Sequence, residues 1–376
     1  MSRLSVFICI PWFHPAFRAG GPVQSIANMV NEIDDIDFSI FCGNTDLNNT
    51  TLDNIETGKW VSYNVHTRVW YSVNDKRSES ILHQITTAKP GILYIIGIFS
   101  WHFNIVPLVF SKVNRKIVSV RGMLHPGALS QKKWKKKIFL ACWKILKLHK
   151  KVSFHASDET EKGYIKNIFG EETDVFVAAN FPRNFIPEQM PPKQPGDLLM
   201  LSIALISPMK NHLLVLEALQ QCKGVIDYHI CGPVKDMEYW QDCLAQAKKL
   251  PLNIRMHYHG DIQPQSVHEY IRKCHVFILP SKSENFGHAI YEALSAGKPV
   301  ITSYHTPWQG LENSRAGVNV STDTVDIKKA IDLFTGMTGD ELMQWSDGAV
   351  SYAGNAIDIG KIKVQYKNMF REQVPS

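Results

Sequence analysis

The sequence predicts an α/β protein made of two Rossmann-like domains whose parallel sheets face each other across a cleft. Two observations lead to this class. Short apolar runs alternate with amphipathic stretches of helix length, as in parallel sheets with crossover helices. The chain also has 376 residues, and a single hydrophobic core rarely supports a chain of that length. Ligands of such sheets bind beyond the carboxyl ends of the strands, so we expect the site between the two domains.

The elements follow in order along both halves. Apolar runs predict strands in the first half at residues 4–10, 38–42, 92–96, 116–120 and 152–155. A proline-dense stretch then predicts a stiff, extended linker at 183–196, after a first domain at 1–182. The second domain, 197–355, has expected strands at 198–204, 227–231, 253–258, 276–279 and 300–302, and expected helices at 213–221 and 238–249.

The composition is that of a globular protein, with 44% hydrophobic and 20% charged residues. The seven cysteines form no C-x-x-C pair, which favours reduced thiols and a cytoplasmic location. No apolar run approaches the roughly 20 residues of a membrane-spanning helix, and the first residues resemble a buried strand more than a signal peptide. We therefore expect a protein that does not cross a membrane.

The most informative segment is residues 276–301, which predicts a strand, a polar loop, a helix that ends at Gly297, and another strand. Gly287 would let a ligand approach the start of this helix, where the amides of Gly287 and His288 and the helix dipole favour a diphosphate. Glu284 in the loop and Glu292 in the helix could border the same ligand, and carboxylates suit the hydroxyl donors of sugars. Alone, the two glutamates would be compatible with an ordinary surface helix.

The setting of Glu284 and Glu292, SENFGHAIYEALSAGKPV, resembles the signature of glycosyltransferase family 4, retaining enzymes of the GT-B architecture. The resemblance implies that Glu284 contacts the donor sugar, that Glu292 holds the ribose hydroxyls, and that Phe286, Gly287 and His288 lie in the donor-binding loop between them. It also implies that the last segment, 356–376, is a helix that returns to the first domain.

Lys210 follows the first strand of the second domain and could meet a phosphate at the same sheet edge. It resembles the lysine of the family's R-x4-K element, which implies a catalytic role with Glu284. Leu205 occupies the position of the expected arginine, so one diphosphate cation is missing. Without its neighbours, Lys210 would be compatible with an ordinary solvated loop lysine.

Two elements of the first half complete the resemblance. Gly20 and Gly21 follow the first strand and resemble the glycine pair that lines the donor phosphates, although a plain strand-to-helix turn would also use them. Arg121 and His125 belong to an RGML-x-P element found in family members that build bacterial surface polysaccharides. The resemblance places both on the acceptor side, but His125 could equally be structural.

The net charge of +6 has a local origin. Nine of the 41 basic residues are lysines at 131–151, which contains no acid, so 32 basic residues face 35 acidic ones elsewhere. An apolar stripe recurs at helical spacing, made of Trp134, Ile138, Ala141 or Cys142, Ile145 and Leu148. It predicts a basic amphipathic helix between Lys132 and Lys151. Its apolar stripe could bind an anionic membrane surface or pack on the first domain. Nucleic acid is not expected, because no recognised binding module is present.

These features predict a glycosyltransferase that moves a sugar from a UDP- or GDP-type donor to a glycan hydroxyl, with a lipid-linked acceptor in surface polysaccharide or O-antigen assembly. We expect neither cofactor nor metal, since no Asp-x-Asp motif has a clear structural place. Peripheral attachment to the inner face of the cell membrane would fit the lysine cluster. One alternative is a non-catalytic partner subunit that binds sugar nucleotides, which Leu205 favours. Another is a soluble enzyme acting on a storage glycan or a small molecule.

Overall fold

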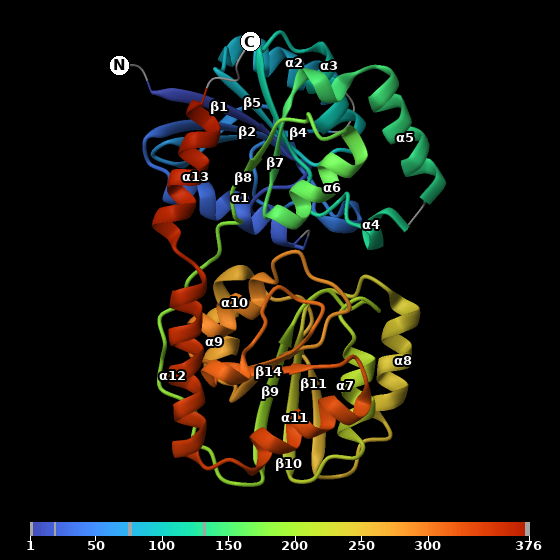
Figure 1. The fold of residues 1–376 in the computed structure, drawn as a ribbon, viewed down its shortest axis with the longest axis vertical. Helices are drawn as coiled ribbons and strands as arrows, with labels where there is room; N and C mark the ends of the chain where they lie inside the picture. Colours follow the sequence, from blue (N-terminus) through green and yellow to red (C-terminus); the bar gives the residue numbers. More distant parts are fainter. Residues whose placement is uncertain (1–2, 19, 74–76, 131–132, 373–376) are drawn as a thin grey trace. The chain divides into compact units, whose positions relative to one another are not determined.

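The computed structural model of the chain describes residues 3–18, 20–73, 77–130 and 133–372. It divides into two compact units, Met1–Phe181 with Ile359–Ser376 and Pro182–Asp358 (Figure 1). Each unit is built on one sheet, with helices on its faces, and the predicted α/β class with two mainly parallel sheets is confirmed.

The first unit has an eight-stranded sheet in the order β3-β4-β2-β1-β5-β6-β7-β8. The strands are β1 (Leu4–Cys9), β2 (Ile36–Gly43), β3 (Trp60–Asn64), β4 (Thr67–Ser72), β5 (Ile92–Ile96), β6 (Arg115–Ser119), β7 (Ser153–Ala156) and β8 (Val175–Val177). Their order reverses between β2 and β5 on either side of β1, which creates a switch point at β1 and β5. We did not expect the antiparallel pair β3–β4 or the strand β8. The two edge strands, β3 and β8, are only partly buried.

Seven helices surround this sheet among the described residues. They are α1 (Gly21–Glu32), α2 (Arg77–Ala88), α3 (Val106–Phe110), α4 (Pro126–Ser130), α5 (Lys133–Ile145), α6 (Glu159–Phe169) and α13 (Ile359–Arg371). The last of these belongs to the first unit although it ends the described chain. Arg115 fixes it there, because its two terminal nitrogens donate to Met369 O and Phe370 O at 2.6 Å each.

The second unit has six parallel strands in the order β11-β10-β9-β12-β13-β14. They are β9 (Asp197–Ile203), β10 (Val225–Cys231), β11 (Ile254–Tyr258), β12 (Val276–Leu279), β13 (Val300–Ser303) and β14 (Gly317–Val320). The chain runs outward from β9 to β11 and then returns to place β12 on the other side of β9. The carboxyl ends of β9 and β12 therefore flank a topological switch point, where ligands of open parallel sheets bind.

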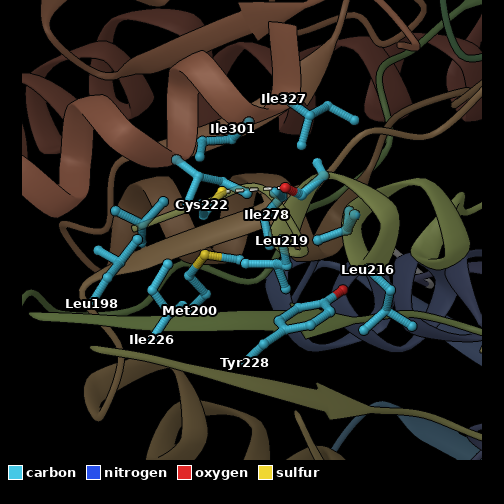
Figure 2. Close-up of a cluster of buried hydrophobic side chains, with 14 of the residues drawn as sticks. Leu198, Met200, Leu216, Leu219, Cys222, Ile226, Tyr228, Ile278, Ile301 and Ile327 are labelled. Atoms are coloured by element: carbon cyan, nitrogen blue, oxygen red, sulfur yellow. Dashed lines mark hydrogen bonds between the residues drawn. The ribbon is translucent and has the colours of Figure 1, made fainter. Parts of the chain in front are cut away.

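Helices cover both faces of the second sheet. They are α7 (His212–Leu219), α8 (Met237–Ala247), α9 (Val267–Arg272), α10 (His288–Ser295), α11 (Thr324–Gly336) and α12 (Gly339–Ala356). One core includes Leu198, Met200, Leu216 and Tyr228, all buried and shown in Figure 2. A second core includes Phe277, Leu279, Leu294 and Trp308. Because strand residues alternate in direction, the two cores hold the sheet rigid from both sides.

The stretch 183–196, expected as a linker, packs on the second unit as an irregular strap. Phe185 N donates to Ser295 Oγ at 3.1 Å, and the Phe185 ring stacks on His268. Lys193 is buried, and its ammonium donates to three carbonyls, including those of Thr335 in the last turn of α11 and Met337 just beyond it. The prolines prevent regular structure here, but they do not prevent packing.

The side of the basic helix α5 that faces the core is not the apolar stripe expected from the sequence. Leu140 and Trp143 are buried, whereas Trp134, Ile138 and Ile145 are 68%, 49% and 77% exposed. The helix also stops at Ile145, and Leu148 is buried in a following 3-10 turn, Leu148–Lys151. Lys132 lies outside the described residues. The interpretation that the stripe packs on the first domain is therefore wrong for Trp134, Ile138 and Ile145.

Candidate functional site

Two loops meet at the switch point of the second unit. One follows β9 and carries Lys210, and the other follows β12 and carries Glu284. Lys210 Nζ donates to Glu284 Oε1 at 2.5 Å, and Ser281 Oγ donates to the same oxygen at 2.8 Å. A backbone hydrogen bond from Lys282 N to Met209 O, 2.9 Å long, joins the two loops directly. The ammonium and the carboxylate are thus held together in advance of any ligand.

The pair is sheltered but open to a ligand. The Lys210 side chain is 19% exposed and that of Glu284 is 11% exposed. At such a partly desolvated position, an ion pair is worth more than at the surface, and each partner keeps hydrogen-bonding capacity for a third group. The ammonium can donate to an anion, while the free carboxylate oxygen can accept from a hydroxyl.

Gly287 starts α10 in a conformation that favours glycine, with φ 78°. A Cβ at this position would lie 3.1 Å from Ile290 Cδ1 and 3.2 Å from Trp308 Nε1. The indole nitrogen of Trp308 donates to Phe286 O at 2.5 Å, which fixes the turn before the helix. No side chain caps the helix start. Its first turn is therefore suited to an anion, as helix amino-terminal ends are.

Phe286 and His288 flank this glycine with their rings 4.7 Å apart. Phe286 also packs edge-on against Trp308, at 5.4 Å between ring centroids. Both side chains are half-buried, so their packing shapes the loop. The structure thus brings together Lys210, Glu284, Phe286, Gly287 and His288 around one helix start.

Glu292 lies one turn inside α10, and the residue is only 7% exposed. Burial raises the pKa of its carboxyl to about 7, although the positive charge of Arg183 acts in the opposite direction. Among the described residues, no side chain hydrogen-bonds to this carboxylate. The carboxylate therefore keeps its capacity to accept hydrogen bonds from another group.

Arg183 was not foreseen from the sequence. It comes from the strap 183–196, where its Nη1 donates to Pro264 O at 2.8 Å and its guanidinium lies over the ring of Phe185. Its influence on Glu292 makes it the cation that partly offsets burial of that carboxylate. A lone arginine in a proline-rich stretch gives no periodic signal, so sequence patterns could not place it.

The position of the missing arginine lies in the same region. Leu205 is half-buried just beyond β9, and its neighbour Ile206 forms a bridge with Val234. The described residues contain no group of three or more His, Cys, Asp or Glu side chains arranged to hold a metal ion.

The residues singled out in the first unit lie at its own strand ends. Gly20 has φ 79° and caps α1, and a Cβ there would meet no atom within 4 Å. Gly21 begins α1, directly before Pro22. The pair therefore makes an open strand-to-helix turn next to the first unit's switch point.

Arg121 is 8% exposed and belongs to an internal network. Its terminal nitrogens donate to Ser25 Oγ at 3.1 Å, Tyr94 OH at 3.1 Å, Tyr366 OH at 3.3 Å, and Asn180 Oδ1. These partners come from α1, β5, α13 and the end of the first unit, so the guanidinium joins four segments. This arrangement gives Arg121 a structural role within the unit.

His125 is half-buried and lies in the turn before α4. Its Nδ1 accepts a hydrogen bond from Gly127 N at 3.1 Å, and its ring packs edge-on against Tyr164. These contacts fix the ring orientation.

The chain is similar to known proteins in both sequence and fold. Residues 186–332 match the family model described as "Glycosyl transferases group 1". This region contains Lys210, Glu284 and Glu292. No sequence among the curated proteins matches the chain.

Solved structures resemble the chain over its whole length. Sucrose-phosphate synthase from Thermosynechococcus elongatus is 16% identical, with a TM-score of 0.74 and coverage of 98% of both chains. HepE from Anabaena, solved in complex with UDP and glucose, is 14% identical, with a TM-score of 0.72 and coverage of 97% of this chain and 99% of its own. WaaG, a glycosyltransferase involved in lipopolysaccharide biosynthesis, is 12% identical, with a TM-score of 0.65 and coverage of 98% and 100%.

The fold is therefore the GT-B fold of these solved glycosyltransferases, and residues 186–332 of the second unit are similar to the glycosyl transferases group 1 model. In addition, none of the helices in the described part of the chain has the length and apolar character needed to cross a bilayer.

Proposed function

We propose that the protein is a retaining glycosyltransferase that moves a sugar from a UDP- or GDP-type donor to a hydroxyl of a glycan acceptor. The observation that carries the proposal is the Lys210–Glu284 pair, held at the switch point beside the uncapped start of α10. This arrangement offers one cation, one helix amino-terminal end and one carboxylate, which match the diphosphate and the sugar of such a donor.

Each group has a distinct task in this proposal. Lys210 and the first-turn amides of α10 stabilise the negative charge that develops on the leaving diphosphate, without a metal. Glu284 accepts hydrogen bonds from the donor sugar, and Glu292 accepts them from the ribose hydroxyls. Phe286, Gly287 and His288 shape the loop between them, and Gly20 and Gly21 are proposed as further donor-binding residues. HepE, which was solved with UDP and glucose, supports a UDP-type donor.

Release of nucleoside diphosphate tests the activity. The purified chain is incubated with UDP- and GDP-sugars and a mixture of membrane glycolipids, and diphosphate release is followed with wild type and Glu284→Gln. We expect release with one donor base, and loss of most of it in the variant. Release equal in both proteins would contradict the assigned role of Glu284.

A second candidate is a non-catalytic subunit that binds sugar nucleotides. Leu205, which replaces the second expected cation, favours it, because a charged hydrogen bond is typically worth about 1.5–3 kcal/mol. Saturable nucleotide binding without diphosphate release, with any acceptor, would support this candidate.

We further propose a lipid-linked acceptor in surface polysaccharide or O-antigen assembly, reached from an anionic membrane surface at the cytoplasmic face. The exposed side of α5 supports this, because Trp134, Ile138 and Ile145 are presented among lysines with no acidic residue on the helix. Apolar residues can enter the headgroup region while lysines meet anionic lipids. The structural resemblance to WaaG, a glycosyltransferase involved in lipopolysaccharide biosynthesis, also supports the proposal of a lipid-linked acceptor.

Vesicle co-sedimentation tests this part separately from catalysis. We expect binding to phosphatidylglycerol vesicles that falls with salt, and weaker binding for Trp134→Ser with Ile145→Ser. Equal binding to neutral and anionic vesicles, or no effect of the two serines, would contradict it.

A further inference from the structure

A pocket of about 480 Å³ lies in the first unit at the amino-terminal edge of β6, β7 and β8. It is formed by the start of β6, by the segment 149–153 that leads into β7, and by the turn before β8. Because these strands are parallel to β1, this edge is opposite the one that carries Gly20 and Arg121. The pocket is therefore separate from the proposed donor and acceptor residues.

We propose that this pocket, here called the β6–β8 pocket, binds a phosphate group presented by the headgroup of an anionic lipid. Four cations line it, Arg115, Lys116, Lys150 and Lys151, against two carboxylates. The excess of positive charge among the lining residues can accommodate the single negative charge of a lipid phosphodiester. This inference goes beyond the proposed transfer reaction and does not depend on it.

The two inner cations are held by carbonyl groups. Arg115 Nη1 and Nη2 donate to Phe370 O and Met369 O, and Lys116 Nζ donates to Leu108 O at 2.8 Å and Ser111 O at 3.0 Å. These are the carboxyl ends of α13 and α3, where helix dipoles favour positive charge. Carbonyl partners position a cation but do not neutralise it, so its charge remains for an anion.

The charges in the pocket also repel one another. Burial lowers the pKa of Lys116, and the positive charge of Lys151 lowers it further. Burial likewise lowers the pKa of Arg115, although the negative charges of Asp174 and Glu372 act in the opposite direction. Across the described residues, none of the four pocket cations forms an ion pair within 4.0 Å. A bound anion would relieve this repulsion.

Two polar atoms of the lining residues lack a hydrogen-bond partner. Arg115 Nε and His149 Nδ1 are buried and unpaired among the described residues. Buried donors are normally satisfied, and a phosphate accepts several hydrogen bonds from such groups.

The position of the pocket indicates a lipid as the source of the phosphate. Ile145 and Leu146 are 77% and 61% exposed at the end of α5, directly before the 3-10 turn that supplies His149, Lys150 and Lys151. Apolar side chains beside a phosphate-sized basic pocket suit the junction of acyl chain and headgroup. A soluble phosphate would make no use of the exposed apolar residues.

The test compares two double variants with the same loss of charge. Lys150→Gln with Lys151→Gln alters the pocket, and Lys133→Gln with Lys135→Gln alters the far end of α5. All four lysines are exposed, so both proteins should fold. Affinity is measured with phosphatidylglycerol and phosphatidylcholine vesicles, and donor-induced thermal stabilisation serves as a control outside the pocket.

We expect the pocket variant to lose about tenfold or more in affinity for phosphatidylglycerol vesicles beyond the loss in the control variant. Glu172→Gln, which removes a carboxylate from the pocket, should increase affinity. Equal losses in the two double variants would overturn the pocket and leave only diffuse attraction to lysines. Lysine-dependent binding of inorganic phosphate without vesicle binding would overturn the lipid source.

Discussion

The Lys210 ammonium and the Glu284 carboxylate are 74 residues apart in sequence, yet they lie 2.5 Å apart in the second unit. Strand order explains this contact, because β9 and β12 are neighbours although two strands separate them along the chain. The loops after adjacent parallel strands meet at one sheet edge. The site is therefore a consequence of the crossover that places β12 beside β9.

Replacing Lys210 by Met removes the cation from the leaving diphosphate and leaves Glu284 without its partner. We expect diphosphate release to fall by about 10²–10³, the range typical for removal of one group that stabilises developing charge. Lys210→Arg should keep more activity than Lys210→Met. Initial rates at saturating donor measure this, and a rate unchanged in Lys210→Met would exclude Lys210 from the reaction.

The Glu292 carboxyl should make ligand binding and stability respond to pH in opposite directions. Its pKa is raised to about 7, so the folded protein holds this proton at a higher pH than the unfolded chain does. The contribution of this group to stability is present at acidic pH and is lost as pH rises through about 7. Ribose binding needs the ionised form, so nucleotide affinity should instead rise over the same range.

Glu292→Gln tests both responses at once. In the wild type, the raised pKa of Glu292 makes the free energy of unfolding fall as the pH rises from about 5 to about 8. Glutamine does not titrate, so this part of the fall should be absent in the unliganded variant. Nucleotide affinity should be weak at every pH. Chemical denaturation and calorimetric titration across the range give the two readings, and a wild-type affinity that rises toward acidic pH would contradict the assignment.

Gly287→Ala should damage both the turn and the site. The substitution places a Cβ in a backbone conformation that residues other than glycine adopt at a cost, close to Ile290 and Trp308. We expect a loss of about 1–2 kcal/mol in the free energy of unfolding and a larger relative loss of nucleotide affinity. Gly336→Ala, where a Cβ meets no atom, is the matched control. Equal effects of both alanines would argue against a special role of Gly287.

Leu205→Arg should restore the missing cation. A new charged hydrogen bond to the diphosphate would contribute about 1.5–3 kcal/mol, roughly a 10- to 150-fold gain in donor affinity. Leu205→Met controls for the change of side chain without charge. If Leu205→Arg gave no gain in donor affinity, the bound diphosphate would not lie close to position 205.

The substitution Arg121→Met distinguishes a structural role of this residue from a role in acceptor binding. Its loss would leave Tyr94, Tyr366 and Asn180 without a shared donor, so Arg121→Met should lower stability by about 3 kcal/mol and loosen α13. Hydrogen exchange over Ile359–Arg371 reports on the helix. Unchanged exchange with a raised KM for acceptor would support the acceptor side instead.

Much of the fold followed from the sequence because apolar runs mark buried parallel strands directly. Residues 276–279 form β12 as expected, and the helix ends at Ser295, just before Gly297. The antiparallel strands β3 and β4 escaped because β3 is a partly buried edge strand, and β4 mixes polar with apolar residues although most of it is buried. The packing of the strap 183–196 on the second unit was not predicted, because proline predicts irregular backbone but carries no information about packing.

The candidate site was partly predictable for a related reason. Glu284, Gly287 and Glu292 lie in one continuous segment, so spacing alone could associate them. The contact of Lys210 with Glu284 needed the strand order, and Arg183 needed the path of the strap. The orientation of α5 also depended on three-dimensional packing, because both of its faces carry apolar residues.

The most direct test of the central claim is thermal unfolding of wild type and Glu292→Ala with UDP-, GDP-, ADP- and dTDP-sugars. A ligand at one hundred times its Kd adds about 2.7 kcal/mol to stability, which gives a visible shift in Tm. Our account predicts that donors of one base stabilise the wild type and that Glu292→Ala abolishes this effect. No shift with any donor, or an equal shift in the variant, would contradict the donor site.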